Sequence, residues 1–169
     1  EEMRRALDRV FAEADEAWRR ELRATRNREL VRLGIRDICL GVSIEEIMAE
    51  LSSLAEAVIQ VELERCLRRS AGAGPVFPGE FCLVAFGKLG GRELNYSSDI
   101  DLLVLSAEPA GAEAQQALGS VMGQLRRDLC EHTDEGYVYR VDLRLRPFGR
   151  SGELVSSLEA LGRYYREKA

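Results

Sequence analysis

The sequence has few of the residues on which several common kinds of active site depend. Its 169 residues include a single histidine, His132, near the end of a predicted helix, where interaction with the helix dipole accounts for it. The four cysteines are far apart, with neither the spacing of zinc ligands nor the density of a disulfide-rich domain. The pattern therefore supports neither a histidine-based triad nor a zinc hydrolase, and it favours a reducing, cytoplasmic location.

Long apolar runs and an excess of positive charge are missing as well. No apolar stretch approaches the roughly 18 residues of a membrane span, and the N-terminal EEMRRALDRV lacks the apolar segment of a signal peptide. Lysine and arginine number 24 against 29 aspartates and glutamates, a net charge of −5. Nucleic-acid-binding domains usually gather a basic surplus on one face. We expect neither a membrane nor a nucleic acid as partner.

The composition that remains, 46% hydrophobic and 31% charged, is that of a soluble folded unit. A chain of this size buries about two-thirds of its unfolded surface, so it needs no metal in order to fold, and any bound metal serves chemistry. The sequence starts at Glu1 without a methionine and stops at Ala169 inside a predicted helix. We therefore interpret it as a fragment of a longer multidomain chain.

Helical periodicity dominates residues 1–72. Apolar positions at helical spacing predict two helices within the first forty residues. The segment Ser43-Ile44-Glu45-Glu46 has the pattern of a capping box and predicts the start of a helix of about 25 residues, which ends before the breaker AGAGP at 71–75. We expect this region to form a helical leader.

Residues 73–169 have a different pattern, typical of an α+β core that is truncated at its C-terminal end. The elements predicted there are strands over 81–86, 99–105 and 137–146 and helices over 112–132 and from Ser156 onward. The whole chain is thus expected to have the α+β fold class, with a helical leader followed by a small mixed sheet flanked by helices.

Three aspartates fall on the predicted strands. Asp99 and Asp101 lie two residues apart at the start of an apolar strand, so their side chains share one face, roughly 6 to 7 Å apart, while Ile100 faces the core. Asp142, on the third strand, joins them if the two strands are neighbours. Each close pair of such carboxylates repels by up to about 4 kcal/mol at an effective dielectric constant near 20, unless protons or cations intervene.

Carboxylates without nearby cysteine or histidine favour a hard cation, Mg²⁺ or Mn²⁺. Such a cluster suits a two-metal site that transfers a phosphorus-containing group. The alternative is a set of solvated aspartates at a strand edge.

The turn GKLGGRELNYSS between the first two strands offers a possible phosphate site. Gly87 ends a strand, and Gly90 and Gly91 permit the positive φ angles that turn backbone N–H groups toward an anion, with Lys88 and Arg92 supplying charge. The turn matches neither the Walker A pattern nor GxGxxG, so a plain loop is the alternative.

Other polar residues near the aspartates also admit two interpretations. Arg140, Arg144 and Arg146 share the expected face of Asp142 and either bind phosphate in bidentate fashion or form the solvated face of a strand. Ser98 either hydrogen-bonds to phosphate or closes a turn.

Together, these motifs resemble a known superfamily. A glycine that ends a strand, a loop of about a dozen residues, an Asp-x-Asp strand and a later third carboxylate resemble the nucleotidyltransferases of the DNA polymerase β type, over about residues 80–146. That superfamily usually has serine or glycine where Lys88 follows Gly87. FGKLGGRELNYSSDIDLLVL and YRVDLRLRPFGRSGELVSSLEALGRYY resemble, more narrowly, the bifunctional glutamine synthetase adenylyltransferase family.

The resemblance implies a polymerase-β-like core, an activity and partners. That family has two nucleotidyltransferase domains: one removes AMP from a tyrosine of glutamine synthetase by phosphorolysis and releases ADP, and the other attaches AMP from ATP. The chain is long enough for one of them. RVDLRLRPFG and the paired Tyr164-Tyr165 resemble the removing domain more closely. Glutamine synthetase is then the protein substrate, and a PII signalling protein is a partner of the full-length enzyme.

The predicted site follows from the residues and the resemblance together. It comprises, for catalysis and for Mg²⁺ or Mn²⁺, Asp99, Asp101 and Asp142, and, for nucleotide and phosphate, Gly87, Lys88, Gly90, Gly91, Ser98, Arg144 and Arg146. The alternatives are the adenylylating domain of the same family, a non-catalytic module that binds glutamine synthetase or PII, and a small-molecule nucleotidyltransferase.

Overall fold

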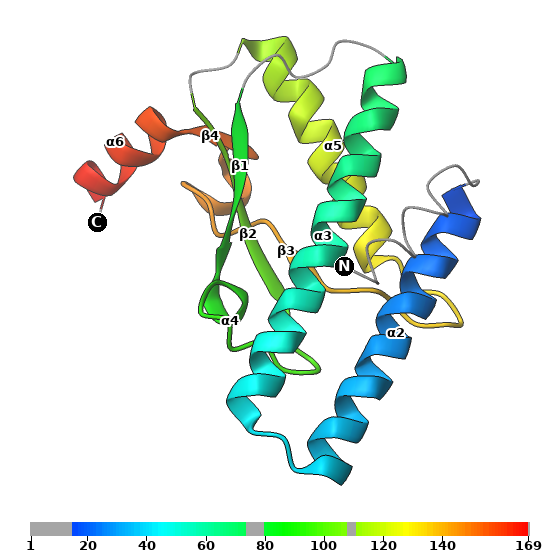
Figure 1. Ribbon diagram of the computed structural model, residues 1–169. Helices are drawn as coiled ribbons and strands as arrows, with labels where there is room; N and C mark the ends of the chain where they lie inside the picture. The colour runs from blue at the N-terminus through cyan, green and yellow to red at the C-terminus, as the bar shows by residue number, and fades with distance from the viewer. Residues whose placement is uncertain (1–14, 74–79, 108–110, 169) are drawn as a thin grey trace.

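Two long helices come first in the chain, and a small sheet with further helices follows (Figure 1). The computed structural model describes residues 15–73, 80–107 and 111–168. The elements, in chain order, are α2 (Asp15–Leu40), α3 (Ile44–Ala73), β1 (Phe81–Phe86), α4 (Gly87–Gly90), β2 (Ile100–Ser106), α5 (Ala112–Cys130), β3 (Val141–Asp142), the 3₁₀ helix η1 (Gly149–Ser151), β4 (Val155–Ser157) and α6 (Leu158–Lys168). Within these ranges no helix is both long and apolar enough to cross a membrane.

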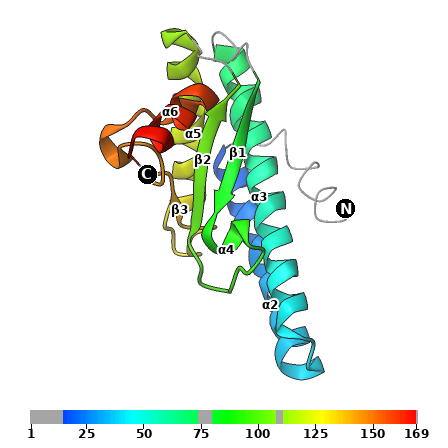
Figure 2. The same cartoon turned by 90° about the vertical axis from the view of Figure 1, so that its left-hand side faces the viewer.

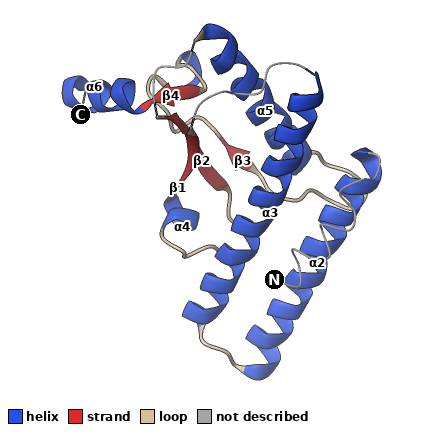
Figure 3. Cartoon of the chain, turned by 45° about the horizontal axis from the view of Figure 1, so that its top comes forward, coloured by secondary structure: helices blue, strands red, loops and turns tan. Residues whose placement is uncertain are grey.

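The strand β2 is the centre of the sheet, whose strands are drawn in red in Figure 3. On one side it pairs with β1 in antiparallel fashion, with Phe86 opposite Asp101. On its other side two short strands follow one another, both parallel to β2: β3 pairs with its first residues and β4 with its last. The sheet is therefore mixed, and the predicted α+β class is confirmed.

The helices α2, α3 and α5 lie together on one side of the sheet, while α6 projects away from it (Figure 1 and Figure 2). From β2, Ile100, Leu102 and Val104 join the apolar side chains of these helices in one hydrophobic cluster, and each is at most 2% exposed. The prediction that Ile100 faces the core is confirmed. The helical leader thus packs directly on the sheet, and a domain division at residues 72 and 73 stays a prediction.

The first helices differ from expectation in number and length. A single helix, α2, spans the described part of the region for which two helices were predicted. Its buried Leu22 and Leu33 are eleven residues apart, close to three full turns, so one straight helix places both on the same face and needs no break. The start of the helix at the Ser43 cap is confirmed, because the Glu46 N–H donates to Ser43 Oγ at 3.2 Å, but the Glu46 carboxylate binds Arg36 and does not complete the capping box. Helix α3 runs to Ala73, past the predicted end.

The third predicted strand, over 137–146, is reduced to two residues. Before it, the N–H groups of Val138 and Tyr139 both donate to the Leu129 carbonyl at the end of α5, so these residues do not extend the ladder. After it, β4 occupies the remaining edge of β2, a strand that the sequence analysis missed. Ser157 ends β4 and its Oγ accepts the Ala160 N–H at 3.1 Å, which starts α6 two residues later than predicted.

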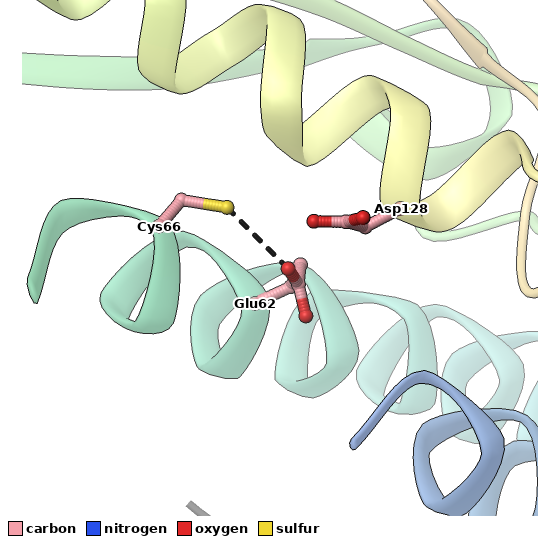
Figure 4. A group of neighbouring side chains, drawn as sticks. All are labelled: Glu62, Cys66 and Asp128. Carbon is pink, nitrogen blue, oxygen red and sulfur yellow. Dashed lines mark hydrogen bonds between the residues drawn. The ribbon is translucent and has the colours of Figure 1, made fainter. Parts of the chain in front are cut away.

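A buried polar junction joins the three helices on the covered side of the sheet (Figure 4). Glu62 of α3 is 0% exposed; its Oε2 accepts the indole N–H of Trp18 at 2.5 Å and its Oε1 accepts the Cys66 thiol at 3.4 Å. Asp128 of α5 points toward it and is held by Arg19 at 2.9 Å and Gln124 at 2.8 Å. Burial, together with the negative charge of Asp128, raises the pKa of Glu62 to about 7.

We expect this junction to make stability fall as pH rises. An unfolded glutamate titrates near 4.5 and the folded Glu62 near 7, so between these values the folded chain holds the extra proton and loses stability with increasing pH, by at most about 1.4 kcal/mol per pH unit. Urea unfolding followed by the fluorescence of the only tryptophan, Trp18, measures this dependence. Glu62→Gln keeps an acceptor for Trp18 and should remove that part of the slope; an identical pH profile in the variant contradicts the assignment.

Candidate active site

The structure brings the three predicted aspartates to one end of the sheet. Asp101 and Asp142 stand opposite each other in the parallel ladder between β2 and β3. Asp99 precedes β2 by one residue and lies two positions before Asp101, so it shares the same face, opposite to the one that buries Ile100. The expected neighbourhood of the two strands is therefore confirmed.

The carboxylates differ in their electrostatic surroundings. Partial burial and the negative charges of Asp142 and Asp99 raise the pKa of Asp101 above its usual range. Hydrogen bonds from Arg144, with a further contribution from the charge of Arg126, lower the pKa of Asp142 instead. Asp101 is thus the member of the group whose negative charge is least compensated by the protein.

Two arginines bind the outer carboxylates directly. The Arg140 Nε donates to Asp99 Oδ1, and its Nη2 donates to the Ser97 carbonyl at 2.9 Å. The Arg144 backbone N–H donates to Asp142 Oδ1 at 2.7 Å, and its Nε donates to both carboxylate oxygens, at 2.9 and 2.8 Å. These two arginines stay beside the aspartates, as the sequence pattern predicts.

Arg146 behaves differently, although it lines the same groove. Its guanidinium donates to backbone carbonyls of its own loop: Leu143, Gly152 at 3.2 Å and Arg150 at 3.5 Å. It therefore closes the loop between β3 and β4 on itself. The strand alternation on which its shared face with Asp142 was predicted ends at Asp142.

Gly87 is required where β1 ends. Its φ is +55°, and a Cβ at this position would lie 2.9 Å from Asp101 Oδ2. Any side chain here would push against the least compensated carboxylate of the site. The predicted position of Gly87 at the strand end is confirmed, but its place under Asp101 has no signal in the sequence.

The rest of the glycine turn departs from the prediction. Gly91 has a φ of −81°, Gly90 is not in the positive region either, and the positive φ of 57° belongs to Arg92. Gly90 is needed for close packing, since a Cβ there would lie 2.5 Å from the Ala85 carbonyl oxygen. The expectation that Gly90 and Gly91 adopt positive φ is wrong, because Gly87–Gly90 forms the short helix α4, on which Lys88 is exposed.

The other polar residues of this segment hold local structure. Arg92 donates to Glu56 at 2.9 Å and to Ser53 at 2.7 Å, so its charge is bound to α3 rather than offered to an anion. Ser98 Oγ donates to Asn95 Oδ1 at 2.7 Å and accepts the Asn95 N–H at 3.1 Å. The turn-closing interpretation of Ser98 therefore holds, and its contact with phosphate stays a prediction.

An open groove of about 740 Å³ runs along the β3 edge beside these carboxylates. Asp99 and Asp142 line it together with six arginines from three places in the chain: α5, β3 and its flanking residues, and the loop before β4. They are Arg126, Arg127, Arg140, Arg144, Arg146 and Arg150. Cys130, also in the lining, ties α5 to the site, because its Sγ accepts the Val141 N–H at 3.2 Å.

Comparison with known proteins assigns the chain to a family. A family model described as glutamate-ammonia ligase adenylyltransferase matches residues 1–169. The chain belongs to this family. The resemblance inferred from the two long motifs is thereby confirmed.

Relatives of this adenylyltransferase family are closely similar over most of the chain. The bifunctional glutamine synthetase adenylyltransferase/adenylyl-removing enzyme of Nitrosococcus oceani is 41% identical over 162 residues, 87% of this chain. The enzymes of the same name from Shewanella woodyi and Vibrio parahaemolyticus are each 40% identical, over 91% and 88% of it. The chain spans 17% of the length of each of these three relatives.

The donor set of this adenylyltransferase-family chain fits a hard divalent cation. Asp99, Asp101 and Asp142 offer only oxygen ligands, and Asp101 carries a negative charge that no arginine or lysine hydrogen-bonds within the described residues. The surrounding guanidinium groups match phosphate oxygens in shape and charge. Such an arrangement can position and neutralise the anions of a nucleotidyl transfer.

Arg126 and Arg127 are groove residues that the sequence pattern does not predict. They lie on α5 between the buried Leu125 and Asp128, where helical spacing indicates only that they are exposed. No local signal shows that this exposed face borders β3, because the contact depends on how α5 packs on the sheet.

Proposed function

We propose that this adenylyltransferase-family chain removes AMP from an adenylylated tyrosine of glutamine synthetase by phosphorolysis. The observation that carries the proposal is the register of Asp101 and Asp142 on adjacent strands, with Gly87 directly beneath Asp101. The direction rests on RVDLRLRPFG and Tyr164-Tyr165, which resemble the removing domain of the family. The relatives carry both adenylyltransferase and adenylyl-removing in their names, so both directions belong to the family.

In the proposed reaction an oxygen of inorganic phosphate attacks the α-phosphorus of adenylyl-tyrosine. The new P–O bond joins phosphate to AMP and gives ADP, while the bond between phosphorus and the tyrosine oxygen breaks. The proton of hydrogen phosphate passes to the tyrosine oxygen, so atoms and charge balance. The work of the protein is then to position anions and to compensate their charge.

Asp99, Asp101 and Asp142 are the proposed ligands of Mg²⁺, or of Mn²⁺. When bound, the cation neutralises phosphate charge and stabilises the leaving tyrosine oxygen. Arg144, which faces the groove and holds Asp142 through Nε and Nη2, is placed to bind a phosphate oxygen through Nη1. The remaining residues of the proposed nucleotide and phosphate set are Gly87, Lys88, Gly90, Gly91, Ser98 and Arg146.

The partners and location are proposed on the same basis. Glutamine synthetase is the proposed protein substrate, since it appears in the names of the relatives. A PII signalling protein is the proposed regulator of the full-length enzyme. A cytoplasmic location agrees with a substrate and a regulator that act in nitrogen metabolism.

Product analysis distinguishes the two directions of transfer. When the chain is incubated with adenylylated glutamine synthetase, phosphate and Mg²⁺, we expect release of ADP, measured by anion-exchange chromatography. A parallel reaction contains unmodified glutamine synthetase and ATP, and we expect no pyrophosphate from it. Pyrophosphate without ADP contradicts the proposed direction and assigns the chain to adenylylation; the absence of both products contradicts catalysis by the chain on its own.

A further inference from the structure

The groove holds more positive charge than its carboxylates neutralise. Of its six arginines, Arg140 and Arg144 bind the two lining aspartates. Across residues 15–73, 80–107 and 111–168, no acidic side chain forms an ion pair with Arg126, Arg127 or Arg150. Because the chain as a whole carries a net charge of −5, this surplus is local and opposite in sign. Arg127 donates to the neutral side chain of Gln124 at 2.8 Å, which leaves its charge uncompensated. A concentration of guanidinium groups without acidic partners in a groove indicates an anion as its ligand.

The surplus lies on a definite side of the carboxylates. In the order β1-β2-β3, the end of β1 lies on one side of the Asp101 and Asp142 pair, and the arginine-lined groove runs along β3 on the other. The end of α5 meets β3 there, tied to it by the hydrogen bond between Cys130 and Val141. The arginines without acidic partners therefore lie on the β3 side of the carboxylates. In-line transfer of a phosphorus-containing group places the nucleophile and the leaving group on opposite sides of the phosphorus.

We propose that Arg126 and Arg127, with Arg150, form the binding site of the attacking inorganic phosphate. This inference rests on the proposed function and names the residues for its second substrate. Gly123, one turn before Arg127 on α5, also lines the groove, and the Arg127 guanidinium lies close to it, since a Cβ at Gly123 would be 3.5 Å from Arg127 Nη1. The adenylyl phosphate then lies on the opposite side of the carboxylates, toward β1.

Direct binding of phosphate tests this site without reference to catalysis. Titration calorimetry of sodium phosphate into the chain, at constant ionic strength because exposed charges are screened by salt, gives the dissociation constant. We expect Arg126→Gln/Arg127→Gln to raise it by at least about tenfold, since two charge-assisted contacts are lost. Arg28→Gln/Arg68→Gln removes the same charge from exposed positions on α2 and α3 and should change it by less than about twofold.

A second pair of variants and a second ligand make the result specific. Arg126→Lys/Arg127→Lys should recover part of the affinity, because lysine restores the charge but not the planar fork. Equal phosphate affinity in the wild type and the glutamine variant overturns the site, and so does a wild-type chain without saturable phosphate binding. If the glutamine variant loses affinity for ADP but not for phosphate, the arginines bind nucleotide phosphates and the assignment is overturned.

The site and the proposed function can fail separately. Phosphate affinity that depends on Arg126 and Arg127, in a chain that forms no ADP from adenylylated glutamine synthetase, supports the anion site and overturns phosphorolysis. Formation of ADP by a glutamine variant with unchanged phosphate affinity supports phosphorolysis and overturns the site.

Discussion

Asp101→Asn is expected to lower the rate of AMP removal by at least about a hundredfold. Asp101 is the carboxylate whose negative charge the protein compensates least, it faces Asp142 across the ladder, and Gly87 leaves space for it. The amide keeps the size of the side chain but loses the charge that a divalent cation requires. Single-turnover release of ADP from adenylylated glutamine synthetase measures the loss.

The same substitution should leave the fold intact or slightly more stable. Since neighbouring carboxylates and partial burial raise the pKa of Asp101, its charged form destabilises the folded chain above its ordinary pKa, and the neutral amide relieves that repulsion. Asp134→Asn, in the exposed turn after α5, is the matched control and should alter neither quantity. Unchanged activity in Asp101→Asn, or the same loss in Asp134→Asn, contradicts the assignment.

Gly90→Ala is expected to destabilise the chain by about 1 to 3 kcal/mol. A Cβ at Gly90 would lie 2.5 Å from the Ala85 carbonyl oxygen. Relief of this clash requires a shift of the backbone of β1 or of α4, because the carbonyl oxygen is a backbone atom and the Cβ is attached directly to the backbone. Displacement of α4 would also shift Gly87 from beneath Asp101, so activity should fall along with stability. Urea unfolding monitored by circular dichroism gives the change in the free energy of unfolding.

A second glycine of the chain, Gly34, provides a control, because its substitution by alanine should raise stability instead of lowering it. Gly34 lies inside α2, and a Cβ at this position would have no neighbouring atom within 4 Å, so Gly34→Ala should stabilise the helix by about 0.5 to 1 kcal/mol. Equal effects of the two substitutions would contradict the close approach of Gly90 to β1.

The parts of the fold that follow local patterns could be predicted from the sequence. The helix start at Ser43 and the apolar strands on either side of the glycine turn have strong local signals, and the structure has them where expected. The alternation of Asp99, Ile100 and Asp101 also fixed the direction of each side chain, since neighbours on a strand point to opposite faces.

Features that depend on packing between distant segments could not be predicted in this way. The alternating segment 137–146 has the pattern of a long strand, but β2 is already occupied along its second half by β4, whose residues carry a helix-start signal. Likewise, Gly90 and Gly91 permit a positive φ but do not adopt it, because Gly90 ends the short helix α4 and Gly91 follows it in the right-handed helical region. The contribution of α5 to the groove is a tertiary contact without a local signature.

The division of one sheet edge between β3 and β4 bears on how such chains can diverge. Strand β3 fixes Asp142, and strand β4 fixes the far end of the loop. Between them, the Arg146 guanidinium donates to backbone carbonyls of the loop and holds it in place. The exposed Leu145 and Phe148 on that segment take part in neither strand. A lineage can therefore exchange these loop residues to suit another protein substrate while it inherits the transfer chemistry unchanged.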